Sequence, residues 1–113
     1  MKQRVDAFVE RHLGDPALTP DGIAAAHGIS TRHLYTLFRE EGRTVAAWIR
    51  ERRLERCRRD LADPSLRDRS IHAIAARWGF TDKAHFSRAF RARYDMTPSD
   101  CRHGLPPTAV LQK

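Results

Sequence analysis

The sequence predicts an all-α fold of about seven helices, arranged as two small helical subdomains joined by a long linker helix. Three observations support this prediction. Apolar residues recur at helical spacing along most of the chain, and the sequence contains neither an alternating strand pattern nor a hairpin dipeptide. Capping residues, glycines and prolines divide this apolar pattern into short segments. Finally, one segment of the first half of the chain recurs in the second half.

The repeat relates residues 23–38 to residues 74–90 and has the pattern of a helix-turn-helix motif. Its matched segments are Ile23-Ala24-Ala25 with Ile74-Ala75-Ala76, Gly28-Ile29-Ser30 with Gly79-Phe80-Thr81, His33-Leu34 with His85-Phe86, and Phe38 with Phe90. The small alanines allow two helices to cross closely, and each glycine can adopt the positive φ that ends a first helix. Ordinary helical hairpins imitate one such motif, but two in register predict two helix-turn-helix subdomains.

The helices of residues 1–43 form the first expected subdomain. Val5, Phe8 and Val9 recur at helical spacing until Gly14-Asp15-Pro16 stops the first helix. Thr19-Pro20-Asp21 then supplies an N-cap, a first-turn proline and an acid favoured by the helix dipole, which predicts a helix over residues 20–27. A third helix is expected over residues 31–41, between a capping serine at position 30 and a terminating glycine at position 42.

Residues 44–63 form the expected linker helix, which Thr44 caps and which runs to about Ala62 before the Asp63-Pro64 stop. The residues expected to be buried along it are Val45, Trp48, Ile49, Leu54, Cys57 and Leu61. Between positions 50 and 60 opposite charges alternate at helical spacing. This pattern favours a solvated, ion-paired face over a reading surface, although single arginines can still touch phosphate.

Residues 64–103 form the second expected subdomain. Ser70 caps a helix over residues 71–78, and Asp82 begins a helix that runs to about Tyr94. The segment Thr97-Pro98-Ser99-Asp100 resembles a capping box and predicts a last short helix. Residues 104–113, which include Pro106-Pro107, contain few anchoring residues and are expected to form a flexible tail.

Composition favours a nucleic-acid partner. The 113 residues contain 21 Lys and Arg against 14 Asp and Glu, a formal net charge of +7, and most of the cations are arginines, which can fork onto phosphate or guanine. The same charge also fits a solvated basic surface. The two cysteines, Cys57 and Cys101, lack metal-ligand spacing, so we expect no disulfide, metal or cofactor. No apolar run approaches the ~20 residues of a membrane span, and the first residues do not lead into a signal-peptide core, which predicts a cytoplasmic protein.

Helical geometry separates a buried side from a reading side in the second helix of each motif. Rotation by 100° per residue from Leu34 places Leu37 and Phe38 on the buried side. Rotation from Phe86 likewise buries Ala89 and Phe90. The opposite, groove-facing sets are Arg32, Thr36 and Arg39 in the first helix and Ala84, Arg88 and Arg91 in the second, with Tyr35 and Ser87 on the flanks.

These sets carry the chemistry of base recognition. Arg32 and Arg88, near the helix starts, can each offer two donors to guanine O6 and N7. The small polar and methyl-bearing side chains, Thr36, Ala84 and Ser87, can contact base edges or a thymine methyl. Deeper along the helices, Arg39 and Arg91 are placed to contact phosphate, which positions the protein without reading sequence. Lys83 and His85 lie at the margin of the second surface; for His33 and His85 we favour packing or hydrogen bonding in the turn over base contact.

The linker suggests a two-part binding site. A helix of about 19 residues is roughly 28 Å long, and major-groove faces on one side of B-DNA recur every ~34 Å. One chain could therefore place both reading helices in adjacent major grooves of an asymmetric site. Alternatives are a protein-interaction module whose basic face binds an acidic partner, or an RNA-binding protein, although the RNA major groove is too narrow for a helix. An enzyme is least favoured, because no catalytic constellation is visible.

The chain resembles the DNA-binding module of the AraC/XylS family of bacterial transcription regulators, from about Val5 to Arg102. The most specific segments are Ile71-x-x-Ile74-Ala75-x-x-x-Gly79-Phe80, Phe86-x-Arg88-x-Phe90-Arg91, Thr97-Pro98 and Arg102. Residues 23–38, Trp48-Ile49-Arg50 and Arg53-Leu54 also look like that family. The resemblance implies seven helices, two helix-turn-helix subdomains and activation by contact with RNA polymerase. Trp48, Trp78 and Phe80 are expected to be core aromatics.

The resemblance also implies which residues read bases. The sequence departs from the family in two respects. The DNA-facing residues it implies are Arg32, Tyr35, Thr36, Lys83, Ala84, His85, Ser87 and Arg88. Cys101 stands where relatives often have an aromatic residue, so we expect weaker docking of the final helix, and plain substitution is favoured over a redox switch. Many relatives carry an effector-binding sensor domain before this module. We expect a fragment of such a regulator, although Met1 favours a short stand-alone regulator.

Overall fold

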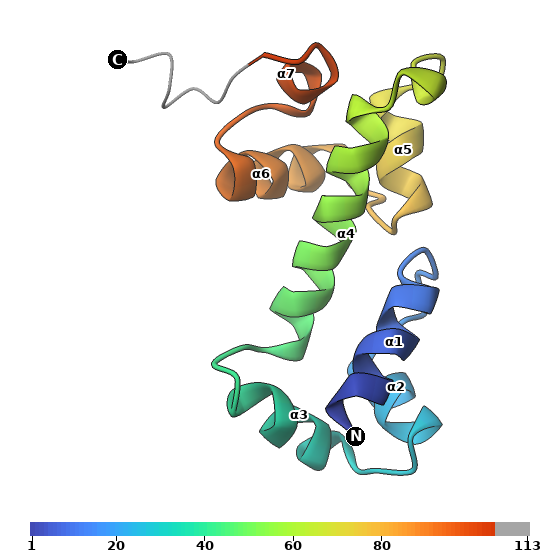
Figure 1. The fold of residues 1–113 in the computed structure, drawn as a ribbon, viewed down its shortest axis with the longest axis vertical. Helices are drawn as coiled ribbons and strands as arrows, with labels where there is room; N and C mark the ends of the chain where they lie inside the picture. The colour runs from blue at the N-terminus through green and yellow to red at the C-terminus, as the bar shows by residue number, and fades with distance from the viewer. Residues whose placement is uncertain (106–113) are drawn as a thin grey trace. The chain divides into compact units, whose positions relative to one another are not determined.

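The computed structural model describes residues 1–105, and within them all regular structure is helical (Figure 1). Its elements are α1 (Lys2–His12), α2 (Pro20–Ala26), α3 (Thr31–Arg39), α4 (Val45–Ala62), the 3-10 helix η1 (Pro64–Leu66), α5 (Ile71–Arg77), α6 (Lys83–Tyr94) and α7 (Pro98–Arg102). The predicted all-α class with seven α-helices is therefore confirmed. The helix expected over residues 31–41 ends two residues earlier, because Glu40 to Gly42 form a turn. None of the described helices is long and apolar enough to cross a membrane.

The chain divides into two compact units, one from Met1 to Arg53 and one beginning at Leu54. The division falls inside α4, so this helix contributes its first half to one core and its second half to the other. All six residues predicted to be buried along α4 are at most 8% exposed. The expected tail of residues 104–113 lies outside the described residues except for Gly104 and Leu105.

Side-chain caps fix where the helices of the first unit begin. Thr19 accepts a hydrogen bond from Gly22 N at 3.1 Å, Ser30 accepts one from His33 N at 3.0 Å, and Thr44 accepts one from Ala47 N at 3.1 Å. Each cap satisfies a backbone donor that has no partner inside its helix. The fully buried core comprises Val5, Val9, Leu13, Ile23, Leu34 and Phe38. Gly28, at φ 66°, makes the predicted turn between α2 and α3.

The second unit repeats this construction. Ser70 and Asp82 cap α5 and α6, and Thr97 with Asp100 forms the predicted capping box of α7. The buried cluster comprises Leu54, Cys57, Leu61, Ile74, Ala75, Phe80, Phe86, Phe90 and Cys101. Both thiols are free and buried, and Cys57 and Cys101 both belong to this cluster.

Some charged residues of α4 form ion pairs, both within the helix and with residues of other elements. Arg58 pairs with Glu55 within α4 at 2.9 Å, whereas Arg52 pairs with Glu10 of α1. Arg53 donates from Nε to Leu13 O and from Nη2 to Asp15 O, each at 2.9 Å. Because these carbonyls follow the end of α1, the guanidinium of Arg53 anchors the exit of that helix to α4.

Candidate DNA interface

Helix α3 exposes the side that was predicted to read DNA. Leu34 and Phe38 are fully buried and Leu37 is partly buried, which fixes the rotation of the helix. The exposed residues on its other side are Arg32, Tyr35, Thr36 and Arg39. Tyr35, at 46% exposed, is one of the few large hydrophobic side chains with high exposure among the described residues. The predicted buried and exposed sides are confirmed, whereas contact with DNA stays a prediction.

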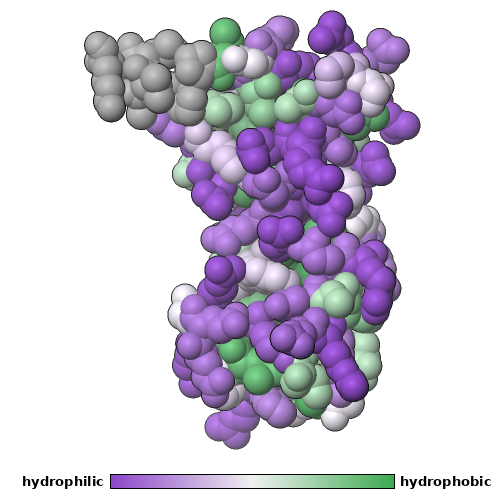
Figure 2. All heavy atoms as spheres, in the orientation of Figure 1, coloured by the Kyte–Doolittle hydropathy of each residue, from purple (hydrophilic) through white to green (hydrophobic). Residues whose placement is uncertain are grey.

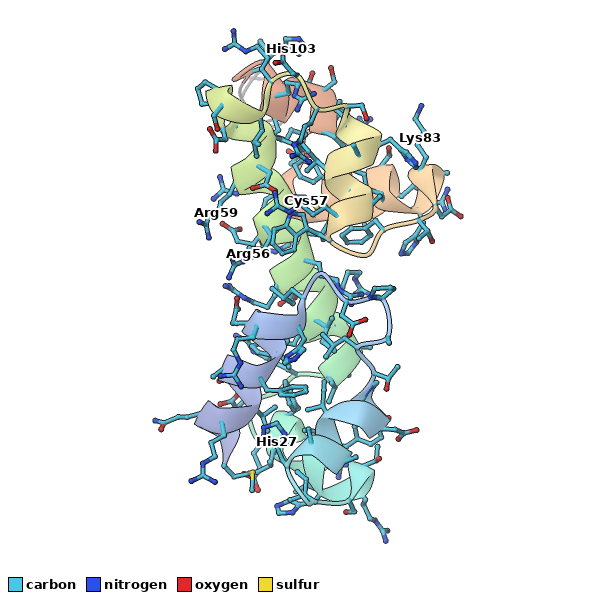
Figure 3. The ribbon with its side chains drawn as sticks, turned by 90° about the vertical axis from the view of Figure 1, so that its right-hand side faces the viewer. His27, Arg56, Cys57, Arg59, Lys83 and His103 are labelled. Atoms are coloured by element: carbon cyan, nitrogen blue, oxygen red, sulfur yellow. The ribbon has the colours of Figure 1, made fainter. Side chains whose placement is uncertain are left out.

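Helix α6 is fixed in the same way by a row of aromatic side chains. Phe86 and Phe90 are at most 2% exposed, and the ring centroids of Phe80 and Phe86 lie 5.1 Å apart. The exposed positions are Lys83, Ala84, His85, Ser87, Arg88 and Arg91. Figure 3 shows Lys83 at the start of α6, directed away from the packed core of its unit. The structure therefore brings all six predicted residues of this helix to its outer surface.

The first turn of each reading helix donates a hydrogen bond to an aspartate carboxylate. Thr31 donates a 2.7 Å hydrogen bond to Asp21 at the start of α2, which ties the two helices together. Asp82 accepts from His85 N at 3.0 Å. This backbone bond, helped by the nearby charge of Arg88, holds the pKa of the Asp82 carboxyl below its usual range. The carboxylate is therefore ionised as a helix cap and lies in the field of a predicted base-reading arginine.

Three side chains differ in detail from the expectation. The hydroxyl of Thr36 donates to Arg32 O at 3.1 Å, so its lone pairs and methyl group, and not its proton, are left to face a base. His33 and His85 were expected to pack or hydrogen-bond in the turns, yet both imidazoles are exposed. Only their backbone N–H groups take part in the turns, by donating to the caps Ser30 and Asp82. The packing interpretation of these two histidines is therefore wrong.

Trp78 is a partial exception to the predicted core aromatics. Trp48 is 8% exposed and Phe80 is 7% exposed, as expected for packing residues. Trp78 is only partly buried, and its indole Nε1 donates to Asp60 at 2.8 Å. The guanidinium carbons of Arg56 and Arg77 lie 5.6 and 5.1 Å from its ring. Trp78 therefore links the end of α5 to α4 through its indole hydrogen bond and is not a fully buried core residue.

A hollow of about 420 Å³ adjoins the reading face of α3 and contains a cation that sequence reasoning missed. Its lining residues include Tyr35 and Arg39 of α3 and Arg43 of the following turn. Arg43 carries no motif signal of its own, because it lies between the repeat and the linker. On the face drawn in Figure 2, hydrophilic side chains predominate and hydrophobic ones form only small patches. The exposed side of α3 is thus polar and cationic, and a partly apolar hollow adjoins it.

Comparison with known proteins agrees with this construction. A family model described as a helix-turn-helix domain matches residues 23–104. The transcriptional activator NphR of a Rhodococcus species is 40% identical over 95 residues, which is 84% of this chain but 28% of NphR. The regulatory protein SoxS of Escherichia coli K12 is 38% identical over 106 residues, which is 91% of this chain and 94% of SoxS.

A solved structure shows the same fold. The AraC-type transcriptional regulator from Chromobacterium violaceum aligns with a TM-score of 0.81 at 30% sequence identity, covering 89% of this chain and 88% of that one. The region matched by the family model contains both motif copies and the intervening α4. The chain therefore belongs to the AraC/XylS-type helix-turn-helix family of DNA-binding transcription regulators.

Proposed function

We propose that this chain binds promoter DNA by inserting α3 and α6 into adjacent major grooves and thereby activates transcription. The observation that carries the proposal is the duplicated motif, in which each second helix buries an apolar side and exposes a polar, cationic one. A helix of this kind fits the major groove of B-DNA, where base edges present a distinct donor and acceptor pattern.

Within this proposal the exposed residues divide into two roles. The base-reading residues are Arg32, Tyr35 and Thr36 on α3 and Lys83, Ala84, His85, Ser87 and Arg88 on α6. Arg39 and Arg91, farther along the helices, bind phosphate and set the position of the protein. Because the two base-reading sets differ in composition, the two halves of the binding site differ in sequence.

One chain is sufficient for a two-part site in this proposal. Helix α4 contains 18 residues and is therefore about 27 Å long at 1.5 Å per residue. This length is comparable with the ~34 Å spacing of major-groove faces on one side of B-DNA once helix width is added. The protein therefore binds as a monomer to an asymmetric duplex.

Two further partners follow from the family. NphR is described as a transcriptional activator, and we propose that this chain likewise activates, through contact with RNA polymerase. Many members of the family carry a sensor domain before the DNA-binding module. The chain spans 28% of NphR and 94% of SoxS. A sensor domain is therefore a proposed partner only if this module belongs to a longer regulator, as the matching segment of NphR does.

The test is a change in the phase of the two half-sites. Selection of duplexes from a random library gives the preferred site, and about half a helical turn of DNA is then inserted between its halves. We expect affinity to fall sharply, because the second helix then meets the wrong side of the duplex. The matched control has the same insertion outside the site and should bind normally. Equal affinity for both duplexes would rule out insertion into two adjacent grooves.

A further inference from the structure

The internal repeat is longer than the helix-turn-helix motif and includes a third helix. Each helix of the first triplet, α2, α3 and α4, begins at a capping side chain, as does each helix of the second, α5, α6 and α7. The matched caps are Thr19 with Ser70, Ser30 with Asp82, and Thr44 with Thr97. Between the last two helices of each triplet lies a residue of left-handed conformation, Gly42 at φ 72° or Asp95 at φ 56°. The linker helix α4 is therefore the structural counterpart of the short α7.

This longer register shows that each unit has a hollow at the same place. The hollow of the first unit is lined by Pro20 of α2, by Tyr35 and Arg39 of α3, and by residues 43–46 at the start of α4. The hollow of the second unit, of about 500 Å³, is lined by the start of α5, by Lys83 and Ser87 of α6, and by residues 97–99 at the start of α7. Ser87 corresponds to Tyr35 in this register. A hollow therefore lies at matching positions in the two units, and a comparison of their linings shows what is particular to each.

The two hollows differ in where their cationic side chains lie and in how many of them are already hydrogen-bonded. The longer register matches Arg43 of the first unit with Met96 of the second, because both directly precede the threonine cap. Met96 is partly buried and packs against the core, whereas Arg43 is exposed at the edge of its hollow. The second hollow also has two cations, Lys83 and Arg102, but Arg102 is partly engaged already, since its Nη2 donates to Leu66 O at 3.2 Å. The first hollow therefore has two available guanidinium groups, Arg39 and Arg43, on an otherwise apolar rim.

We propose that the hollow of the first unit seats the sugar-phosphate backbone that borders the groove read by α3, with Arg43 as an additional phosphate-binding residue. This inference rests on the proposed function and adds a phosphate-binding site next to the surface of α3 that reads bases. The apolar floor, formed by Pro20, Val45 and Ala46, suits the C–H groups of deoxyribose. The guanidinium groups of Arg39 and Arg43 suit phosphate oxygens, which they can bind through paired N–H donors. The hollow adjoins α3, and a sugar-phosphate backbone borders any groove that α3 enters, which favours DNA over an acidic peptide as the occupant.

The electrostatic surroundings leave Arg43 available for a phosphate. No ion pair or side-chain hydrogen bond of Arg43 is found within residues 1–105. The nearest acid along the chain is Glu41, whose carboxylate pairs with Lys2 Nζ at 2.8 Å. This pairing, more than the charge of Arg43, lowers the pKa of the Glu41 carboxyl. Lys2 therefore neutralises the carboxylate that would otherwise compete most directly with DNA for Arg43.

The test compares salt dependence in two charge-matched variants. Arg43→Met copies the residue of the second unit, and Arg50→Ala removes an exposed arginine of α4 that does not line the hollow. Each phosphate that the protein binds contributes about 0.9 to the slope of log K against log salt. We expect Arg43→Met to lower that slope by about 0.9, so that it loses about 3.5-fold less affinity than wild type between 50 and 200 mM salt. Arg50→Ala should leave the slope unchanged.

A second measurement locates the bound phosphate on the DNA. Neutral methylphosphonate groups are introduced one at a time along the preferred duplex, and one position should weaken wild type while leaving Arg43→Met unaffected. An unchanged slope for Arg43→Met, or an equal fall for Arg50→Ala, would overturn the proposed seat. The slopes are also measured on a scrambled duplex, where the same difference is expected. Equal binding of wild type to both duplexes would instead refute specific reading, and it leaves the slope comparison as an independent result.

Discussion

The two units share a framework and differ in the surface that the framework presents. Helix caps, the left-handed residue after each reading helix and the buried alanine of each motif occur at matching positions. The exposed faces share Arg39 with Arg91 but differ at other positions, since Arg32, Tyr35 and Thr36 of α3 correspond to Ala84, Ser87 and Arg88 of α6. Backbone-fixing residues are thus retained where geometry requires them, and groove-facing residues vary where recognition differs. This is the pattern expected of one scaffold that reads two different sequences.

The cores also differ, in how aromatic residues are held. In the first unit Trp48 is nearly buried against Phe38, at a centroid distance of 5.4 Å, and Lys2 Nζ lies 5.0 Å from the Trp48 ring. In the second unit two partly buried aromatic side chains are also held by hydrogen bonds at their edges. Trp78 donates to Asp60 at 2.8 Å, and the Tyr94 hydroxyl donates to Glu55 at 2.9 Å. Both cores are packed, and hydrogen bonds to aromatic side chains add to the packing in the second.

Replacing each tryptophan by alanine should give the largest effects and should sharpen this contrast. Trp48→Ala should destabilise its unit by about 3 to 5 kcal/mol, because a nearly buried aromatic leaves a cavity. Trp78→Ala should cost less, since its ring is only partly buried and remains in part exposed to solvent. Urea unfolding followed by circular dichroism measures both. Normal stability of Trp48→Ala together with altered sequence preference would place Trp48 at the DNA interface instead.

Most of this framework could be predicted from the sequence, because local chemistry determines it. The caps Thr19, Ser30 and Ser70 satisfy backbone donors within three residues, so their position alone identifies a helix start. The buried sides of α3 and α6 likewise follow from a periodicity of 3.6 residues. Both features depend on neighbours along the chain and not on the rest of the fold.

Features that depend on distant residues escaped prediction. The hydrogen bond between Trp78 and Asp60 joins residues 18 apart in the sequence, and the hydrogen bond from Arg53 to Leu13 O joins residues 40 apart. The exposure of His33 and His85 also depends on how each turn meets the rest of its unit. Arg43 was missed for a related reason: its meaning emerges only when α4 is matched with α7, and their lengths of 18 and 5 residues hide that relation.

The next largest effects should separate reading from positioning within each unit. Arg32→Ala and Arg88→Ala should each cost about 1 to 3 kcal/mol on the preferred duplex and flatten discrimination at one base pair. Arg39→Ala and Arg91→Ala should weaken preferred and scrambled duplexes alike and lower the salt slope by about 0.9 for each phosphate that the variant no longer binds. Paired salt titrations on the two duplexes provide the measurement, with Lys83→Ala as an intermediate case.

Equal losses of affinity for all four variants on both duplexes would contradict this division of roles. Base recognition would then have to lie with the remaining exposed residues, which are Tyr35, Thr36, Ala84, His85 and Ser87. If only the second unit showed the division, α3 would only position the protein on the DNA. The two units would then differ in role, because α6 alone would read bases.

The smallest expected effect is a loss of stability at alkaline pH that begins in the second unit. Burial raises the pKa of the Cys57 thiol from its usual 9.0 to about 12. A group whose pKa is raised on folding contributes stability that is complete below its unfolded pKa and is lost as pH rises toward the folded value. At pH 10 this loss should be about 1.4 kcal/mol, since only the unfolded thiol is then largely ionised. In the first unit Lys2 has a raised pKa, but its contribution declines only above pH 10.5.

Each unit contains one of the two tryptophans, so fluorescence can follow the units separately. Trp48→Phe leaves Trp78 to report on the second unit, and Trp78→Phe leaves Trp48 to report on the first. Urea unfolding at pH 7.5 and pH 10 should show the larger fall in the unfolding free energy of the second unit. Cys57→Ala, which lowers stability at both pH values by truncating a buried side chain, should reduce the difference between them. An equal fall in both units, or a difference that Cys57→Ala retains in full, would mean that the buried thiol is not its source.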